Sequence, residues 1–203
     1  MREVGGILKY KILKSTNNEA RRLIEEIDNL SVITTESQPG GRGQGDHTWY
    51  STPGKNLTFT FVLKYEAFER PLKATDAILI TCLTTLALRS LLLQEGIEAR
   101  IKWPNDIWVG DRKICGILIE NILDGENVSR SIVGVGLDVN EEGWPEDLPN
   151  PVSMLELTGK TYDRDALLER LHKEICRHAE MLDSDDGRKY LQEEFGKYVF
   201  RLS

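Results

Sequence analysis

The chain has 203 residues, 40% of them hydrophobic, and a formal net charge of −7. This length suits one domain with one substantial core, and the acidic balance argues against a large nucleic-acid surface, although local basic patches remain compatible with it. Three widely separated cysteines give neither a disulfide framework nor a Cys-x-x-Cys metal pair, which is typical of a reducing cytosol. Without a signal pattern or an apolar run of about 18 residues, we expect a cytoplasmic protein with no membrane segment.

The first third of the chain predicts strands around one helix. Residues 3–13 are expected to form a strand, after which a helix opens at Ser15 with a Thr-x-x-Glu capping box and ends near residue 27. Residues 31–35 predict a short β-branched strand, residues 38–48 a glycine-rich loop, and residues 56–64 another strand.

The remainder of the chain predicts helices that pack on a sheet. Residues 75–94 are apolar on nearly every face, which indicates a core helix, too polar and interrupted to span a membrane. Residues 141–151, rich in proline and acid, predict a surface loop. Strands are expected at 98–102, 107–109, 113–122 and 128–139, with a turn at 124–127, and helices at 163–182 and 187–195, after a solvated acidic loop at 183–186. This order predicts an α+β fold with a mixed, mostly antiparallel sheet.

The run from Lys102 to Asp106, Lys-Trp-Pro-Asn-Asp, places a cation, an amide and a carboxylate at one bend. Because a residue before proline avoids the helical region, the strand should stop there and set Asn105 and Asp106 in a turn. The strand, tight turn and strand that follow would return Lys113 to this bend. We therefore expect these side chains to face a pocket and not the core.

Four glycines in the six positions 40 to 45 surround Arg42. Glycines open unusual backbone conformations and bring amide groups against an anion, although this pattern alone is a weak signal. The sequence contains neither a complete Gly-x-Gly-x-x-Gly dinucleotide-binding motif nor a P-loop motif. Arginine suits a bidentate clamp on phosphate or carboxylate, and lysine suits charge that develops during reaction. The cations that could serve in this way are Arg42, Lys102, Arg112 and Lys113.

Three ordered runs of the sequence resemble the signatures of the biotin protein ligases. They are residues 35–57, residues 102–120 and residues 133–140. The resemblance implies the fold that biotin and lipoate ligases share with class II aminoacyl-tRNA synthetases. It also implies a two-step reaction, in which biotin and ATP with Mg²⁺ give biotinoyl-5′-AMP and pyrophosphate. A lysine of a biotin carboxyl carrier protein then attacks this mixed anhydride and releases AMP.

The resemblance also implies roles for individual residues. The expected catalytic residues are Lys113 and Arg42. The expected biotin-binding residues are Ser15, Thr16, Asn17, Gln38, Gly41, Arg42, Gly43, Gln44, Lys113, Gly116 and Gly134. The expected nucleotide-binding residues are Trp49, Lys102, Asn105, Asp106 and Asp138, with Asp106 as the candidate ligand for Mg²⁺. Two further aromatic residues, Trp103 and Trp108, are expected to belong to the core.

Three positions depart from the family pattern. Gln44 and His47 stand where phosphate-facing arginines are common, which weakens or removes two positive charges. Asp138 replaces the usual asparagine, which removes an amide donor and adds charge near the nucleotide. This last change would either weaken ATP binding or offer a carboxylate to magnesium.

By the same resemblance, residues 1–203 are a ligase catalytic domain without the N-terminal helix-turn-helix of repressor-type ligases and without their small C-terminal β-barrel. We expect no DNA binding, and a homodimer stays open because family members often pair through a sheet edge. Two other functions stay open. One is a non-catalytic or truncated binder of biotin or biotinoyl-AMP. The other, less favoured, is a lipoate ligase or octanoyl transferase, families that lack these paired motifs.

Overall fold

The computed structural model describes residues 4–201. Their strands form one mixed sheet. Its strands are β1 (Ile7–Ile12), β2 (Val32–Ser37), β3 (Leu57–Lys64), β4 (Leu72–Lys73), β5 (Arg100–Lys102), β6 (Asp106–Val109), β7 (Arg112–Asp124), β8 (Asn127–Leu137) and β9 (Val199–Phe200). The strand order is β1-β2-β3-β8-β7-β6-β5-β9, with β4 also paired to β8. Within the described residues, β1–β2 and β5–β9 are parallel pairs and the others are antiparallel. The predicted mixed, mostly antiparallel sheet is confirmed.

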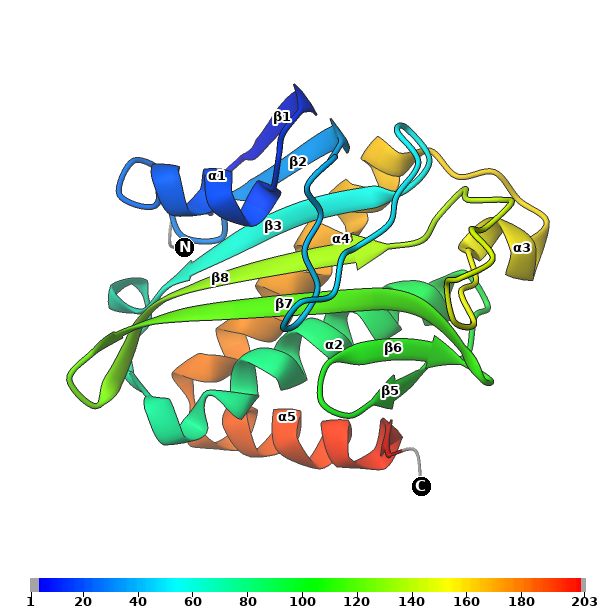
Figure 1. Ribbon diagram of the computed structural model, residues 1–203. Coiled ribbons are helices and arrows are strands. Elements are labelled where there is room, and N and C mark those ends of the chain that lie inside the picture. Colours follow the sequence, from blue (N-terminus) through cyan, green and yellow to red (C-terminus); the bar gives the residue numbers. More distant parts are fainter. Residues whose placement is uncertain (1–3, 202–203) are drawn as a thin grey trace.

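Helices cover the two faces of this sheet unequally. They are α1 (Thr16–Leu23), α2 (Ile78–Gln94), α3 (Met154–Thr158), α4 (Arg164–Ala179) and α5 (Asp185–Tyr198), with short 3₁₀ turns at Tyr65–Ala67, Ala74–Asp76 and Glu180–Asp183. In Figure 1, α2 and α4 lie behind the sheet and α5 packs beside α2, whereas α1 lies on the opposite face, which we call the front. The front face is therefore only partly covered by helix.

The segment Ala74–Gln94 is long and apolar enough to cross a membrane by length and composition, so the expectation that it is too polar and interrupted is wrong. Within the fold, however, 67% of its most apolar window is buried. Leu83 and Leu88 are fully enclosed in the large core between the sheet and α2, α4 and α5. A buried core helix can be as long and as apolar as a membrane helix, so the length and composition of this segment are weak support for a membrane span.

The predicted capping box at the start of α1 is wrong. Ser15 is the N-cap residue and makes no side-chain capping bond, while the Thr16 hydroxyl donates to Gln38 Oε1 at 3.1 Å. A capping box does occur at α3, a helix that the sequence did not predict. There Ser153 Oγ accepts a hydrogen bond from the Glu156 amide (3.1 Å), and Glu156 Oε2 accepts one from the Ser153 amide (2.9 Å).

The ends of several elements differ from their predicted positions. The first strand was expected from residue 3, which lies outside the described residues, and β1 begins only at Ile7. The acidic residues 183–186 are not simply a loop, because α5 begins at Asp185, with Ser184 Oγ accepting from the Gly187 amide at 3.0 Å. Acidic side chains in the first turn suit the positive end of a helix. The two-residue strands β4 and β9 carry too little pattern to predict.

A long loop covers the part of the front face that α1 leaves open. The small core beneath α1 includes Ile33, Val62 and Ile132, toward one end of the sheet. The loop of residues 38–56, between β2 and β3, crosses in front of β3, β8 and β7 (Figure 1). The space between this loop and the sheet holds the candidate site.

Candidate functional site

A cavity of about 680 Å³ opens on the front of the sheet, between α1, the loop 38–56, the β5–β6 turn and the segment 144–151. All residues singled out from the sequence as binding or catalytic line this cavity, except Gly41. Gly41 lies beside it, where a Cβ would meet the Trp49 carbonyl oxygen at 2.5 Å. Arg112, one of the four candidate cations, is not among the lining residues. The three motifs thus meet in space, while the roles of their members stay predictions.

Glycines form the floor of the cavity. On β7 and β8, Gly116 pairs with Gly136, and Gly134 lies two residues earlier on the same face. A Cβ would meet the Trp49 indole at 2.8 Å from Gly116 and at 2.2 Å from Gly136, and would meet Asn17 Oδ1 at 2.2 Å from Gly134. Glycine is therefore needed at all three positions, because Trp49 and Asn17 lie directly on the sheet. The Trp49 Nε1 atom is buried there without a hydrogen-bond partner.

A buried polar network lies where α1 begins. Gln38 Oε1 accepts hydrogen bonds from the Thr16 amide (2.8 Å) and from the Thr16 hydroxyl (3.1 Å). The Thr60 hydroxyl lies 2.8 Å from Thr16 Oγ1 and 2.7 Å from Asn17 Oδ1. Sequence reasoning missed Thr60, because a threonine inside an apolar strand is an ordinary β-sheet residue and gives no signal of a site.

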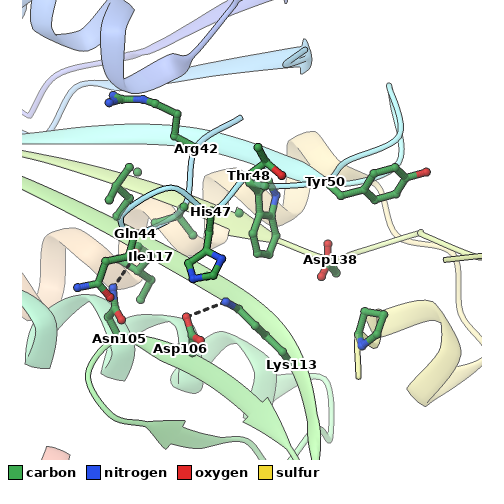
Figure 2. Close-up of a pocket in the computed structure, with 18 of the residues that line it drawn as sticks. Arg42, Gln44, His47, Thr48, Tyr50, Asn105, Asp106, Lys113, Ile117 and Asp138 are labelled. Atoms are coloured by element: carbon green, nitrogen blue, oxygen red, sulfur yellow. Dashed lines mark hydrogen bonds and ion pairs between the residues drawn. The ribbon is translucent and has the colours of Figure 1, made fainter. Parts of the chain in front are cut away.

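Arg42 reaches away from the other predicted catalytic residue. Its Nη2 atom donates to Asn18 Oδ1 at 3.0 Å and lies 3.4 Å from Glu120 Oε2. Figure 2 shows the Arg42 side chain pointing away from Lys113, which lies across the cavity. The partner Glu120 was not predicted as a site residue. It ends the motif that begins at Lys113, and this position in the motif was the only available signal.

The predicted return of Lys113 to the β5–β6 bend is confirmed. Lys113 Nζ forms an ion pair with Asp106 Oδ1 at 2.9 Å (Figure 2) and lies 5.6 Å from the centre of the Trp49 ring. Its backbone amide donates to the Asn150 carbonyl at 2.7 Å, which holds this end of β7 in place. Figure 2 also shows the His47 ring pointing toward the ion pair. This corner of the cavity therefore brings a cation, a carboxylate and an imidazole together.

Two other residues of the bend, Asn105 and Lys102, have side chains that contact neighbouring parts of the protein. Asn105 Nδ2 donates to the Ile117 carbonyl at 2.5 Å. Lys102 Nζ lies 4.5 Å from the centre of the Trp108 ring. Trp108 is buried, as predicted, but the core assignment of Trp103 is wrong, because this side chain is 40% exposed at the turn.

The glycine-rich loop is a narrow hairpin. The Gly43 amide donates to the His47 carbonyl (2.7 Å), and the Trp49 amide donates to the Gly41 carbonyl (3.0 Å). Of the glycines at 40 to 45, Gly45 has a positive φ, of 64°. At Gly41 the glycine is required by crowding, because a Cβ would lie 2.5 Å from the Trp49 carbonyl oxygen, and at Gly43 a Cβ would fit tightly, 3.1 Å from the His47 Cβ. The prediction that the glycines beside Arg42 adopt unusual conformations is therefore wrong for these two.

Asp138 is an unusual carboxyl group in the cavity wall. It is 3% exposed, and its Oδ1 atom is buried without a hydrogen-bond partner. Burial raises the pKa of Asp138 well above its usual range, and the nearby Glu141 raises it further. Glu141, by contrast, has partners: its Oε2 atom accepts from the Thr52 amide (3.0 Å) and from Asn56 Nδ2 (2.7 Å). The environment thus disfavours the extra negative charge that the sequence predicted at position 138.

The segment 141–151 is more than the predicted surface loop. Glu141 is 1% exposed, and Trp144, Leu148 and Pro151 line the cavity. Proline and acidic residues suggested solvent exposure, but the Asn150 carbonyl accepts a hydrogen bond from the Lys113 amide, and Val152, just after the segment, donates to the Lys113 carbonyl. The segment therefore forms one wall of the candidate site.

The residues of the cavity fit a magnesium ion that arrives with a nucleotide. Across residues 4–201, no group of three or more His, Cys, Asp or Glu side chains is placed to hold a metal ion. The candidate ligand Asp106 is paired with Lys113. Mg²⁺ is commonly held by one or two carboxylates together with substrate phosphates, which needs no dedicated protein cage.

Residues 10–138 match the profile of the biotin/lipoate A/B protein ligase family. The chain is 32% identical to the biotin–[acetyl-CoA-carboxylase] ligase of Paracoccus denitrificans, over 84% of this chain and 71% of that protein. It is 27% identical to the bifunctional ligase/repressor BirA of Bacillus subtilis (strain 168), over 81% of this chain. It spans about half of that relative's length, 51%. Among solved structures, the biotin protein ligase from Aquifex aeolicus in complex with biotin and ATP superposes with a TM-score of 0.75 at 25% identity, covering 96% of this chain and 78% of the other.

Proposed function

Because the chain belongs to the biotin/lipoate A/B protein ligase family, we propose that it is an ATP-dependent biotin protein ligase. It activates biotin to biotinoyl-5′-AMP with release of pyrophosphate, and then transfers biotin to a lysine of a biotin carboxyl carrier protein. The observation that carries this proposal is the meeting of three separate sequence motifs around one cavity.

Biotin would bind where α1 meets the glycine floor. The side chains of Ser15, Thr16, Asn17 and Gln38 offer both donors and acceptors, which suits the N–H and C=O groups of a ureido ring. Gly134 lets the Asn17 side chain lie directly against β8, which would set the Asn17 amide at the level of the ligand. The carboxylate tail would then extend along the floor past Gly116, toward Lys113.

Adenylation brings two anions together. An oxygen of the biotin carboxylate forms a bond to the α-phosphorus, and the bond from that phosphorus to the pyrophosphate oxygen breaks. Lys113 would offset the negative charge that develops on the phosphoryl oxygens, and its ion pair with Asp106 supports this role by holding the ammonium in position beforehand. Mg²⁺ bound with ATP would supply further positive charge at the phosphates, and Asp106 is the carboxylate that would hold it. Arg42 would clamp an anionic group after turning from its present position.

The remaining site residues would bind the nucleotide and exclude water. Trp49 would provide an aromatic surface for adenine, and Lys102, Asn105 and Asp138, which line the same cavity, would contact the rest of the nucleotide. The loop 38–56 covers the cavity, and such a cover protects a reactive anhydride from hydrolysis until the carrier lysine arrives.

Biotin-dependent exchange of pyrophosphate into ATP tests this proposal, with lipoate and octanoate as parallel substrates. We expect exchange with biotin alone. Exchange with lipoate or octanoate would favour the related ligase functions. Biotin binding without exchange would favour a non-catalytic binder, in which Gln44 and His47 leave too little positive charge.

The variant Lys113→Ala should lower the exchange rate by about 100-fold or more, because it removes the cation proposed to offset the charge on the phosphoryl oxygens. It removes little core volume, so the protein should stay folded. The matched control is Lys11→Ala, which removes an exposed lysine from the edge strand β1. Exchange within a few-fold of the parent in Lys113→Ala would refute the catalytic role.

We also propose that the protein acts in the cytoplasm, that it does not bind nucleic acid, and that two chains pair through a free sheet edge. The net charge of −7 disfavours a nucleic-acid partner. The outer edge of β1 is one such edge within the described sheet. Sedimentation at several protein concentrations, with and without biotin, tests the pairing, and a monomer under all conditions would rule it out.

A further inference from the structure

Glu120 lies next to the proposed biotin site without lining the cavity. It stands on β7 two residues after Leu118 and four after Gly116, so these three positions share the front face of the sheet. Its Oε2 atom accepts a hydrogen bond from Asn17 Nδ2 at 2.8 Å, and its Oε1 atom lies 3.3 Å from Arg21 Nη2. Any effect of Glu120 on the cavity must therefore pass through its neighbours.

We propose that Glu120 is a positioning residue that fixes the side-chain amide of Asn17, and thereby makes Asn17 an acceptor for an N–H group of the ligand. This inference rests on the proposed function, because it concerns how the same cavity recognises biotin. No contact between Glu120 and the ligand is required.

The first step of the argument concerns the two ends of the Asn17 amide. An ionised carboxylate can only accept hydrogen bonds, so the amide must turn its NH₂ group toward Glu120. The opposite end, Oδ1, then faces the Thr60 hydroxyl at 2.7 Å. Reversing the amide would set an oxygen against the Glu120 carboxylate. Two arginines, Arg21 and Arg42, lie within 3.4 Å of this carboxylate and pair with its charge.

The second step concerns the hydrogen-bonding capacity that Asn17 has left. Its side chain is almost completely buried, and its two N–H groups face Glu120 and the Leu118 carbonyl, the latter at 3.4 Å. Oδ1 has two lone pairs and at most one is used by Thr60. Because a Cβ at Gly134 would touch this oxygen at 2.2 Å, Oδ1 lies on the cavity floor. Asn17 can thus offer a ligand one acceptor and no donor, which matches a ureido N–H.

Calorimetric biotin binding and exchange kinetics of Glu120→Ala, Asn17→Ala and the double variant test this inference. We expect Glu120→Ala to weaken biotin binding by about 10-fold, with KM for biotin raised and KM for ATP changed less than about 2-fold. If Glu120 acts through Asn17, the double variant should bind biotin no more weakly than Asn17→Ala alone. Glu120→Gln, which keeps the shape and one acceptor, should recover part of the affinity.

The matched control is Arg21→Ala, which removes a charged neighbour of Glu120 but leaves its bond to Asn17. Biotin affinity in this variant should stay within about 2-fold of the parent. The inference is overturned if the losses in Asn17→Ala and Glu120→Ala simply add, or if Glu120→Ala raises both KM values equally. Failure of the parent protein itself to bind biotin would instead refute the proposed function.

Discussion

At the scale of single residues, burial changes what a side chain can do. Asp138 and Glu141 are both buried carboxyl groups near the cavity, but only Glu141 has donors arranged around it. Asp138 Oδ1 has none and its pKa is raised by burial, so the protonated form is favoured there. A protonated carboxyl combines an O–H donor with a carbonyl acceptor, much as the amide of an asparagine combines N–H donors with a carbonyl acceptor.

Asp138→Asn should reveal this protonation through stability. With a raised pKa, the folded protein keeps a proton that the unfolded chain releases, so stability falls as pH rises above the usual aspartate range. An asparagine at this position does not titrate, so the variant does not lose stability in this way as the pH rises. The melting temperature of the variant relative to the parent should therefore increase from pH 4 to pH 8, by about 2–4 °C for each kcal/mol regained.

Thermal unfolding of both proteins at several pH values measures this difference. Asp111→Asn, at an exposed turn position, is the control and should show no such trend. A difference between Asp138→Asn and the parent that stays constant or shrinks toward pH 8 would mean that Asp138 is ionised in the folded protein.

At the scale of elements, the site depends on how α1 rests on the sheet. The first turn of α1 meets β8 at Gly134, where no side chain separates the strand from Asn17. A glycine in a strand often marks such a close approach, and the motif around residues 133–140 therefore pointed to a real feature. The sequence did not show which side chain would occupy the space.

Gly134→Ala should lower biotin affinity by about 10-fold or more, because the new methyl group would displace the Asn17 amide. The strand should still form, since alanine is compatible with β structure. Calorimetry measures the affinity, and circular dichroism checks the fold. Gly196→Ala in α5 is the control, because its Cβ would meet nothing within 4 Å, and it should stabilise the helix by up to about 1 kcal/mol. Unchanged affinity in Gly134→Ala would show that Asn17 moves freely or does not contact biotin.

At the scale of the whole molecule, the sheet has one face devoted to stability and one that holds the site. Three helices enclose the large core behind it, which explains why α2 is apolar enough to satisfy the composition of a membrane helix. The front face carries glycines, a covering loop and the segment 141–151. Because these parts come from all along the chain, a ligand that touches them should stabilise the fold as one unit.

Biotin at about 100 times its Kd should stabilise the protein by about 2.7 kcal/mol, which corresponds to a rise in melting temperature of about 5–11 °C for a chain of this size. Thermal unfolding with increasing biotin measures this effect, and lipoate serves as the comparison ligand. No rise at saturating biotin, or an equal rise with lipoate, would contradict biotin recognition.

Local patterns in the chain predicted most of the element types and the mixed sheet, and the resemblance to the biotin protein ligases pointed to the motif residues that line the cavity. Strand alternation, the proline bend at Pro104 and the turn before Lys113 act over a few neighbouring residues, so they can be read without the fold. Contacts across the chain established the rest. Glu120 meets Asn17 across 103 residues, and Glu141 meets Asn56 across 85. Such pairs leave no local trace, because burial and hydrogen-bonding partners depend on which distant segments the sheet brings together.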